Sequence, residues 1–174
     1  MVCGLASDPD GRRLTALGRD GAIFDVTSAT KEVVRHAIAL RGPTYMSGVT
    51  HVRDQLVAYG GSNQVYAGAE SAWTAIDDDI YEALEPGRLH AVYAAVEATD
   101  GGLVACGRAR TAARRDGDRW RGLAPPTRMP LHALTNAGDE TLALVGAAGT
   151  ALLLERFGRW HDPTEGVGLG ETLW

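Results

Sequence analysis

Lysine, cysteine and aromatic residues are scarce in this chain of 174 residues. Of its 17 basic residues, only Lys31 is a lysine. Two cysteines are too few for the disulfide framework that stabilises small secreted domains. No apolar run approaches the roughly 18 residues of a membrane-spanning helix. The start of the chain, MVCGLASDPDGRR, lacks the basic and then apolar regions of a secretory signal. We therefore expect a soluble, cytoplasmic protein.

The composition is that of one folded, mildly acidic domain. Apolar residues make up 45% of the chain, which argues against disorder. The formal net charge of −5 argues against a dedicated nucleic-acid binder, because such proteins normally present a basic face. The 22 glycines predict many tight turns.

A short apolar segment that ends in glycine occurs four times. Each copy has a leucine four residues before the glycine, and three have an alanine two residues before it. The copies are Leu14–Gly18, Leu56–Gly60, Leu103–Gly107 and Leu142–Gly146. Their glycines are 42, 47 and 39 residues apart, and Trp73, Trp120 and Trp160 follow the last three by 13 or 14 residues. This spacing indicates an internal structural repeat.

Each repeat is predicted to contain four short strands. An apolar run precedes each leucine–glycine segment, and a polar turn such as Asp-Pro-Asp-Gly separates the two. Glycine accepts the positive φ that tight hairpin turns require. A third run follows the glycine, and a fourth contains the tryptophan or, in the first repeat, Val33 and Val34. Four antiparallel strands over about 43 residues are typical of one β-propeller blade.

The predicted fold is an all-β, small β-propeller of about four blades in a single domain. The blades cover approximately residues 1–40, 41–84, 85–126 and 127–165, with a tail at 166–174. The tryptophans are expected to pack between blades, and the recurring glycine to allow close backbone approach. Short helices are an alternative at residues 29–40 and 77–87.

The pattern L-x-A-x-G, followed by an apolar run and a G-x-W segment, resembles the degenerate blades of two propeller families. These are the sialidase-like (BNR-type) and photosystem-assembly-factor-type propellers, and the resemblance covers about residues 1–163. The sialidase Asp-box S-x-D-x-G-x-T-W is absent from all four repeats. The sialidase arginine triad, Tyr–Glu pair and Asp have no counterparts at matching positions. The resemblance therefore implies the fold, with WD40-like blades, and not glycosidase activity.

Four blades leave open how the ring is completed. The tail GVGLGETLW is similar to the segments that begin the third and fourth blades. It could pair with the first blade and clasp a closed four-bladed ring, and we favour such a closed or nearly closed small propeller. Alternatively, the chain is part of a larger propeller that a missing segment or a second copy completes. Exposed edge strands would then promote association.

An acidic run after the Trp73 strand of the second repeat, in the connection to the next blade, is one candidate binding site. It contains Asp77, Asp78, Asp79, Tyr81 and Glu82. Connections between blades lie on a propeller rim, so this run would present an acidic surface that steers a basic partner. The alternative is a solvated helix start, because carboxylates stabilise a helix N-terminus.

An arginine-rich segment in the third repeat is the second candidate. It contains Arg108, Arg110, Arg114 and Arg115, followed by Arg119 and Arg121. Alternating strand positions would place Arg108, Arg110 and Arg114 on one face, where they would bind an anionic partner. The alternative is an exposed sheet edge that its charges protect from association.

No sequence pattern predicts catalysis, a metal or a cofactor. The five histidines lack metal-ligand spacing, and the Gly-rich segments 60–64 and 146–149 are not P-loops. Cys3 and Cys106 are predicted to lie in apolar surroundings on strands, where cysteine behaves as a small hydrophobe.

These observations favour a non-enzymatic propeller that docks another protein on its rim. A bacterial immunity-type inhibitor or an assembly factor would fit the small size and acidic charge. The alternatives are a carbohydrate-binding, lectin-like propeller and a sialidase-fold glycosidase or lyase. We expect no membrane or nucleic-acid partner, and a homo-oligomer if the propeller is incomplete.

Overall fold

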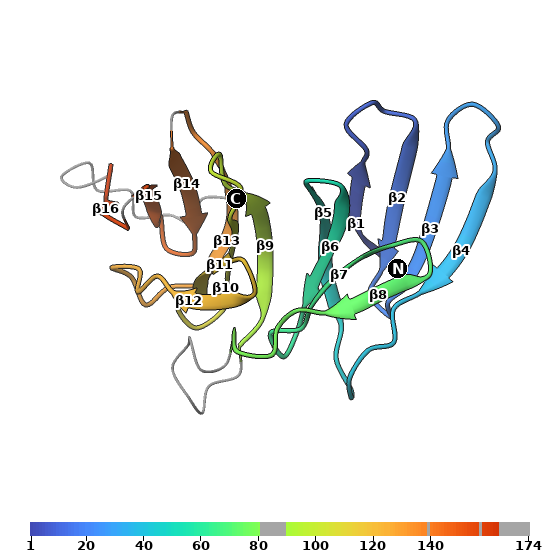
Figure 1. The fold of residues 1–174 in the computed structure, drawn as a ribbon. Coiled ribbons are helices and arrows are strands. Elements are labelled where there is room, and N and C mark those ends of the chain that lie inside the picture. Colours follow the sequence, from blue (N-terminus) through green and yellow to red (C-terminus); the bar gives the residue numbers. More distant parts are fainter. Residues whose placement is uncertain (81–89, 139, 157, 164–174) are drawn as a thin grey trace.

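Sixteen short strands form the described part of the molecule (Figure 1). The computed structural model describes residues 1–80, 90–138, 140–156 and 158–163. The strands assemble into four antiparallel four-stranded sheets, each with its strands in chain order. We number them sheets 1 to 4 along the chain. This arrangement confirms the prediction of an all-β fold with four blades.

The strand bounds are as follows. Sheet 1 contains β1 (Val2–Ser7), β2 (Arg13–Gly18), β3 (Ala22–Thr27) and β4 (Val33–Ala37). Sheet 2 contains β5 (Met46–Val52), β6 (Gln55–Gly60), β7 (Val65–Ala69) and β8 (Ala72–Ala75). Sheet 3 contains β9 (Val92–Glu97), β10 (Leu103–Gly107), β11 (Ala112–Asp116) and β12 (Arg119–Gly122). Sheet 4 contains β13 (Leu131–Asn136), β14 (Thr141–Gly146), β15 (Ala151–Glu155) and β16 (Trp160–His161).

The two segments with partial helical character have different outcomes. Residues 29–40 contain strand β4, so the helix alternative is wrong there. The pairing of β4 with β3 outweighs the weak helical periodicity of this segment. The helix alternative for 77–87 falls largely on residues 81–87, which lie outside the described residues.

The recurring glycine lies where the second strand of a sheet meets the start of its first strand. In sheets 2, 3 and 4, a Cβ added to this glycine would collide with a backbone carbonyl oxygen. The next residue donates its N–H to that same carbonyl. The three bonds run from Gly61 to Tyr45 (2.8 Å), from Arg108 to Ala91 (2.9 Å) and from Ala147 to Pro130 (3.0 Å). The predicted close approach of the backbone is therefore confirmed, and it excludes any side chain at these glycines.

Each sheet has two faces that play different parts. We call the face that bears Trp73, Trp120 or Trp160 the tryptophan face of its sheet, and the other one the back face. Val33 of sheet 1 pairs with Val26 in the register position where Trp160 of sheet 4 pairs with Leu154. The tryptophan face of sheet 1 is therefore the face that bears Val33.

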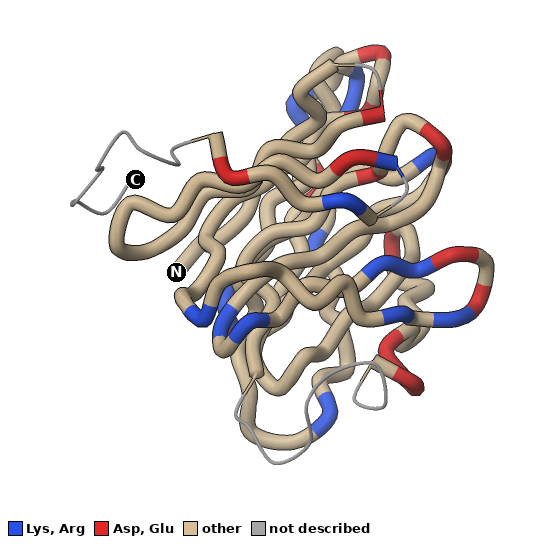
Figure 2. Tube along the Cα trace, turned by 90° about the vertical axis from the view of Figure 1, so that its left-hand side faces the viewer, with Lys and Arg blue, Asp and Glu red and all other residues tan. Residues whose placement is uncertain are grey.

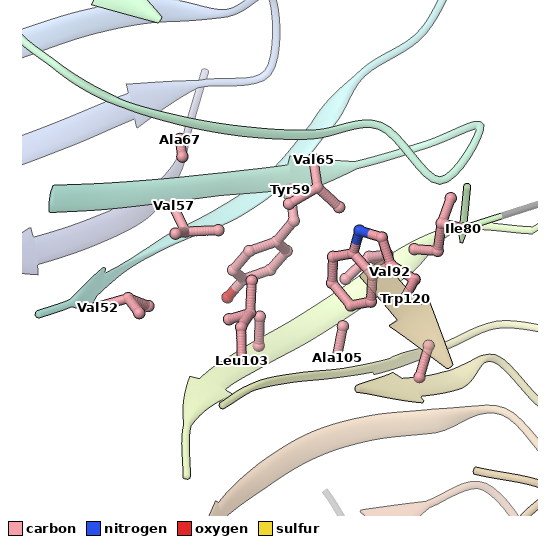
Figure 3. Packing of buried hydrophobic residues seen from close by; sticks show 12 residues of the cluster. Val52, Val57, Tyr59, Val65, Ala67, Ile80, Val92, Leu103, Ala105 and Trp120 are labelled. Atoms are coloured by element: carbon pink, nitrogen blue, oxygen red, sulfur yellow. The ribbon is translucent and has the colours of Figure 1, made fainter. Parts of the chain in front are cut away.

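Three hydrophobic cores lie between successive sheets. In each, the tryptophan face of one sheet packs on the back face of the sheet before it. Figure 3 shows Tyr59 of sheet 2 beside Leu103, Ala105 and Trp120 of sheet 3. The Trp120 indole donates to the Ile76 carbonyl at 2.6 Å, at the end of the preceding sheet. The predicted packing of tryptophans between blades is thus confirmed for this interface.

The four sheets follow one another along an open arc. Their first strands, β1, β5, β9 and β13, pack side by side in that order. Sheet 1 lies at one end of the arc and sheet 4 at the other (Figure 1). The favoured closed four-bladed ring is therefore wrong for the residues that the structure describes. The tail 166–174, which was expected to clasp such a ring, lies outside them.

Candidate binding site

A cleft of about 400 Å³ opens between sheets 3 and 4. One wall includes the β9–β10 turn, Arg114 of β11 and the last residues of β12, and the other includes the β13–β14 and β15–β16 turns. The charged lining residues are Asp100, Arg114, Arg121, Glu140, Glu155 and Arg156. The cleft therefore combines three cations and three carboxylates over an apolar floor that includes Leu142 and Leu154.

Arg114 is a fixed part of this cleft. Its side chain is 16% exposed and donates to Asp100 at 2.7 Å and to Asp116 at 2.6 Å. The hydrogen bond from Arg114 holds the pKa of Asp100 below its ordinary value. Because two of its N–H groups already donate to carboxylates of the same sheet, Arg114 stabilises the wall of the cleft.

Two other arginines are more accessible, one on each wall. Arg121 of β12 is 72% exposed and lies 3.4 Å from Asp116. Arg156, after β15, is 49% exposed and pairs with Glu140. Surface ion pairs of this kind contribute only about 0–1 kcal/mol each. A carboxylate on a partner can therefore replace the present ones at little cost.

The arginine-rich segment is divided by a turn. Arg108 and Arg110 lie between β10 and β11, in a turn that the Gly107 N–H closes by donating to Thr111 O at 2.8 Å. Ala109 and Arg110 have φ values of 55° and 65° there. The expectation that Arg108, Arg110 and Arg114 alternate on one strand face is therefore wrong. Neither Ala109 nor Arg110 signals a left-handed turn in the sequence.

Arg114 and Arg115 are neighbours on β11 and point to opposite faces of sheet 3. Arg114 lies on the back face towards sheet 4, in register with Val104 and Arg121. Arg115 lies on the tryptophan face, in register with Trp120, and its guanidinium lies 3.1 Å from Asp118. Of the four arginines predicted to bind, Arg114 alone lines the cleft.

Two carboxylates of the acidic run, Asp77 and Asp79, form hydrogen bonds within the fold. Asp77 is buried, pairs with Arg41 and accepts the Val65 N–H at 3.3 Å. Asp79 accepts the Trp120 N–H at 3.1 Å and so connects the end of sheet 2 to sheet 3.

Asp78 is the exposed carboxylate among the described members of this run, with its nearest cation, Arg41, at 3.7 Å. Tyr81 and Glu82 lie outside the described residues. A docking role for the acidic run stays a prediction, and in the described part of the chain it would depend on Asp78.

The charged residues of sheet 4 were not singled out in the sequence. Glu140 and Arg156 lie in separate turns of the last repeat, and nothing local distinguishes them from other polar turn residues. Their relevance comes from the packing of sheet 4 on sheet 3, which brings them to the same cleft. Figure 2 shows acidic and basic residues close together in several loops, while long stretches of the chain carry neither.

Histidine and cysteine side chains have structural surroundings. Burial raises the pKa of Cys106 to about 12, which keeps this thiol protonated and unreactive. His90 lies 3.1 Å from the Thr111 hydroxyl, and His132 stacks on Tyr93. Within the described ranges, no three His, Cys, Asp or Glu side chains gather as metal ligands. No described helix is long and apolar enough to cross a membrane.

Solved structures identify the architecture. The WD40 β-propeller domain of Doa1 superposes with a TM-score of 0.68 at 11% identity. The structure of YCF48 bound to D1 peptide gives 0.64 at 11% identity, and the computationally designed Ika4 protein gives 0.66 at 12%. The fold is that of a β-propeller. No family model matches the chain, and no curated protein matches it either. The sialidase-type (BNR) part of the resemblance therefore stays a prediction.

The lengths of these proteins differ from one another. The alignments cover 92% of this chain but 53% of the Doa1 chain and 52% of the YCF48 chain. For Ika4 they cover 89% of this chain and 91% of that one. The chain thus spans about half the length of the first two propellers, which agrees with its open arc.

Proposed function

We propose that this chain is a non-enzymatic propeller that binds another protein, and that an acidic segment of the partner docks in the cleft between sheets 3 and 4. The observation that supports it is the pair of exposed guanidinium groups, Arg121 and Arg156, on opposite walls of one cleft. A guanidinium presents parallel N–H donors that match a carboxylate. An acidic side chain between the two walls would be bound from both sides.

The shape of the site favours a segment of chain over a small metabolite. The cleft is partly open to solvent, and its floor includes apolar side chains between the charged turns. An extended peptide can place an acidic group at the arginines and an apolar one on the floor. YCF48, which has the same fold, has been solved with a bound peptide. An assembly factor or an immunity-type inhibitor would use such a site.

Defined peptides test this function. The probes are fluorescent octapeptides that alternate Glu with Leu, and matched peptides in which Gln or Lys replaces Glu. We expect the Glu peptide to bind most tightly and to bind less tightly as salt increases. The binding variant is Arg121→Glu, and the matched control is Arg12→Glu. Arg12 is 83% exposed, pairs with Asp10 in the β1–β2 turn and lies outside the cleft.

The two variants change the total charge equally, so their difference reports the site itself. Arg121→Glu should weaken binding of the Glu peptide by about tenfold, or about 1.4 kcal/mol. Arg12→Glu should have a much smaller effect. Equal binding of the Glu and Gln peptides, or equal losses in the two variants, would contradict the proposal.

A further inference from the structure

The first end of the arc carries an exposed apolar face. Leu5, Leu14 and Val33 are 63%, 42% and 58% exposed on the tryptophan face of sheet 1. The register places Phe24 on the same face as Leu5, and Val26 between Leu14 and Val33. Contiguous apolar patches of this kind on a protein surface mark interaction sites.

In the other three sheets the tryptophan face is buried against a neighbouring sheet. In sheet 3 the positions that match Leu5, Leu14, Phe24 and Val33 hold Ala95, Leu103, Ala113 and Trp120, all buried against sheet 2. Arg115 matches Val26. Sheets 2 and 4 bury the same face against sheets 1 and 3. The tryptophan face is thus one half of a repeated interface, and among the described residues no sheet packs on this face of sheet 1.

The other end of the arc carries the complementary half. On the back face of sheet 4, Ala133 pairs with Val145 and Val145 with Ala151, while Ala143 pairs with Leu153. None of these five side chains is fully buried. In sheets 1, 2 and 3 the back face receives the tryptophan face of the next sheet.

The curvature of the arc keeps the tryptophan face of sheet 1 apart from the back face of sheet 4 in the same chain. Sheets 1 and 4 of one chain lie at opposite ends and do not pack together within the described residues. Propellers of about twice this length superpose on the arc over 92% of the chain. The arc therefore has roughly the curvature of half a ring, and propellers of up to eight blades are common.

We propose that two copies of this chain close one eight-bladed ring. The tryptophan face of sheet 1 in each copy packs on the back face of sheet 4 in the other, which repeats the interface already present three times within the chain. A head-to-tail contact makes a closed assembly when the rotation that relates neighbouring copies adds up to a full turn. Two half rings, each related to the other by half a turn, meet this condition.

Two charge variants test the head-to-tail geometry. Leu5→Asp places a carboxylate on the tryptophan face of sheet 1, and Ala133→Arg places a guanidinium on the back face of sheet 4. Both positions are exposed in the single chain, so neither change disturbs its core. Ser71→Asp, in the exposed β7–β8 turn, is the control. Circular dichroism verifies that each variant keeps its β-structure, and light scattering measures the mass.

The wild-type chain and the Ser71→Asp variant should have twice the chain mass of 18.4 kDa. Each charge variant alone damages both interfaces of the ring and should have the single-chain mass. An equimolar mixture of the two charge variants should regain the double mass, because one interface is then wild type and the other pairs Asp with Arg. Three results would overturn the proposal: a single-chain mass for the wild type, an Ala133→Arg variant that keeps the double mass, or a mixture that stays single.

Discussion

Sheets 3 and 1 are built on the same repeat, yet the tryptophan face of sheet 3 is buried and that of sheet 1 is exposed. In sheet 3, Trp120 and Ala95 are 6% and 8% exposed and pack against sheet 2. In sheet 1, Val33 and Leu5 occupy matching register positions and are mostly exposed. The strands and pairings are alike, so the difference comes from whether another described sheet packs on the tryptophan face. A blade of this fold is therefore half of two interfaces, and its stability depends on both neighbours.

The largest difference in stability between the two sheets is expected for the matched residues Trp120 and Val33 of their outer strands. Trp120→Ala removes a buried indole and its hydrogen bond to Ile76, and should lower the free energy of unfolding by about 3–5 kcal/mol. Val33→Ala removes mostly exposed methyl groups and should cost less than about 1 kcal/mol. Urea unfolding in the Leu5→Asp background measures both, since that variant keeps the chains single. Equal losses of unfolding free energy in the two variants would show that Val33 is as buried as Trp120, which would contradict this comparison.

A second contrast concerns the recurring glycine. A Cβ at Gly107 would collide with the carbonyl oxygen of Ala91 and approach the backbone of Val92, which cannot move without distorting β9. We expect Gly107→Ala to cost about 2–4 kcal/mol in thermal or urea unfolding. At Gly18 of sheet 1, the nearest atom is Oδ1 of the exposed Asp20 at 2.6 Å, a side chain that can rotate away. Gly18→Ala should therefore cost less than about 1 kcal/mol, and a similar loss at both glycines would refute this contrast.

The smallest effect is a difference between the two thiols at alkaline pH. Burial raises the pKa of Cys106 in sheet 3 from 9.0 to about 12. The folded state therefore holds this proton more tightly than the unfolded state does. The resulting stability is complete below pH 9 and is lost as the pH rises towards 12, by about 1.4 kcal/mol per pH unit.

Urea unfolding curves between pH 8 and 10 measure this dependence, because the thiol pKa in unfolded chains is about 9. The free energy of unfolding of Cys106→Ala should fall less steeply with pH than that of the wild type. The half-buried Cys3 of sheet 1 also has a raised pKa, chiefly through burial, but it should react with thiol reagents before Cys106 does. Parallel declines for the wild type and Cys106→Ala would exclude Cys106 as the source.

The strands and their packing could be predicted because they depend on local patterns. The leucine–glycine segment specifies a strand, its end and a close backbone approach within five residues. The tryptophan at a fixed distance specifies the outer strand and the face that packs on the preceding sheet. The leucine–glycine segment occurs four times and the tryptophan three times, and this recurrence supports the same strand assignment in every repeat.

The overall shape and the cleft could not be predicted in the same way. The angle between sheets depends on how side chains such as Ala105 and Tyr59 fill the space between them, and so the sequence repeat did not distinguish a ring from an arc. The burial of Asp77 depends on Arg41, which is 36 residues away. The removal of Arg110 from a strand face depends on a left-handed turn that its residue type does not signal.

Sedimentation of the wild-type chain over a dilution series tests the central claim most directly. If the two end faces are halves of one interface, the mass at high concentration is twice 18.4 kDa and falls towards 18.4 kDa as dilution separates the copies. A mass of 18.4 kDa at every concentration would show that another copy of the chain does not cover the face formed by Leu5, Leu14 and Val33.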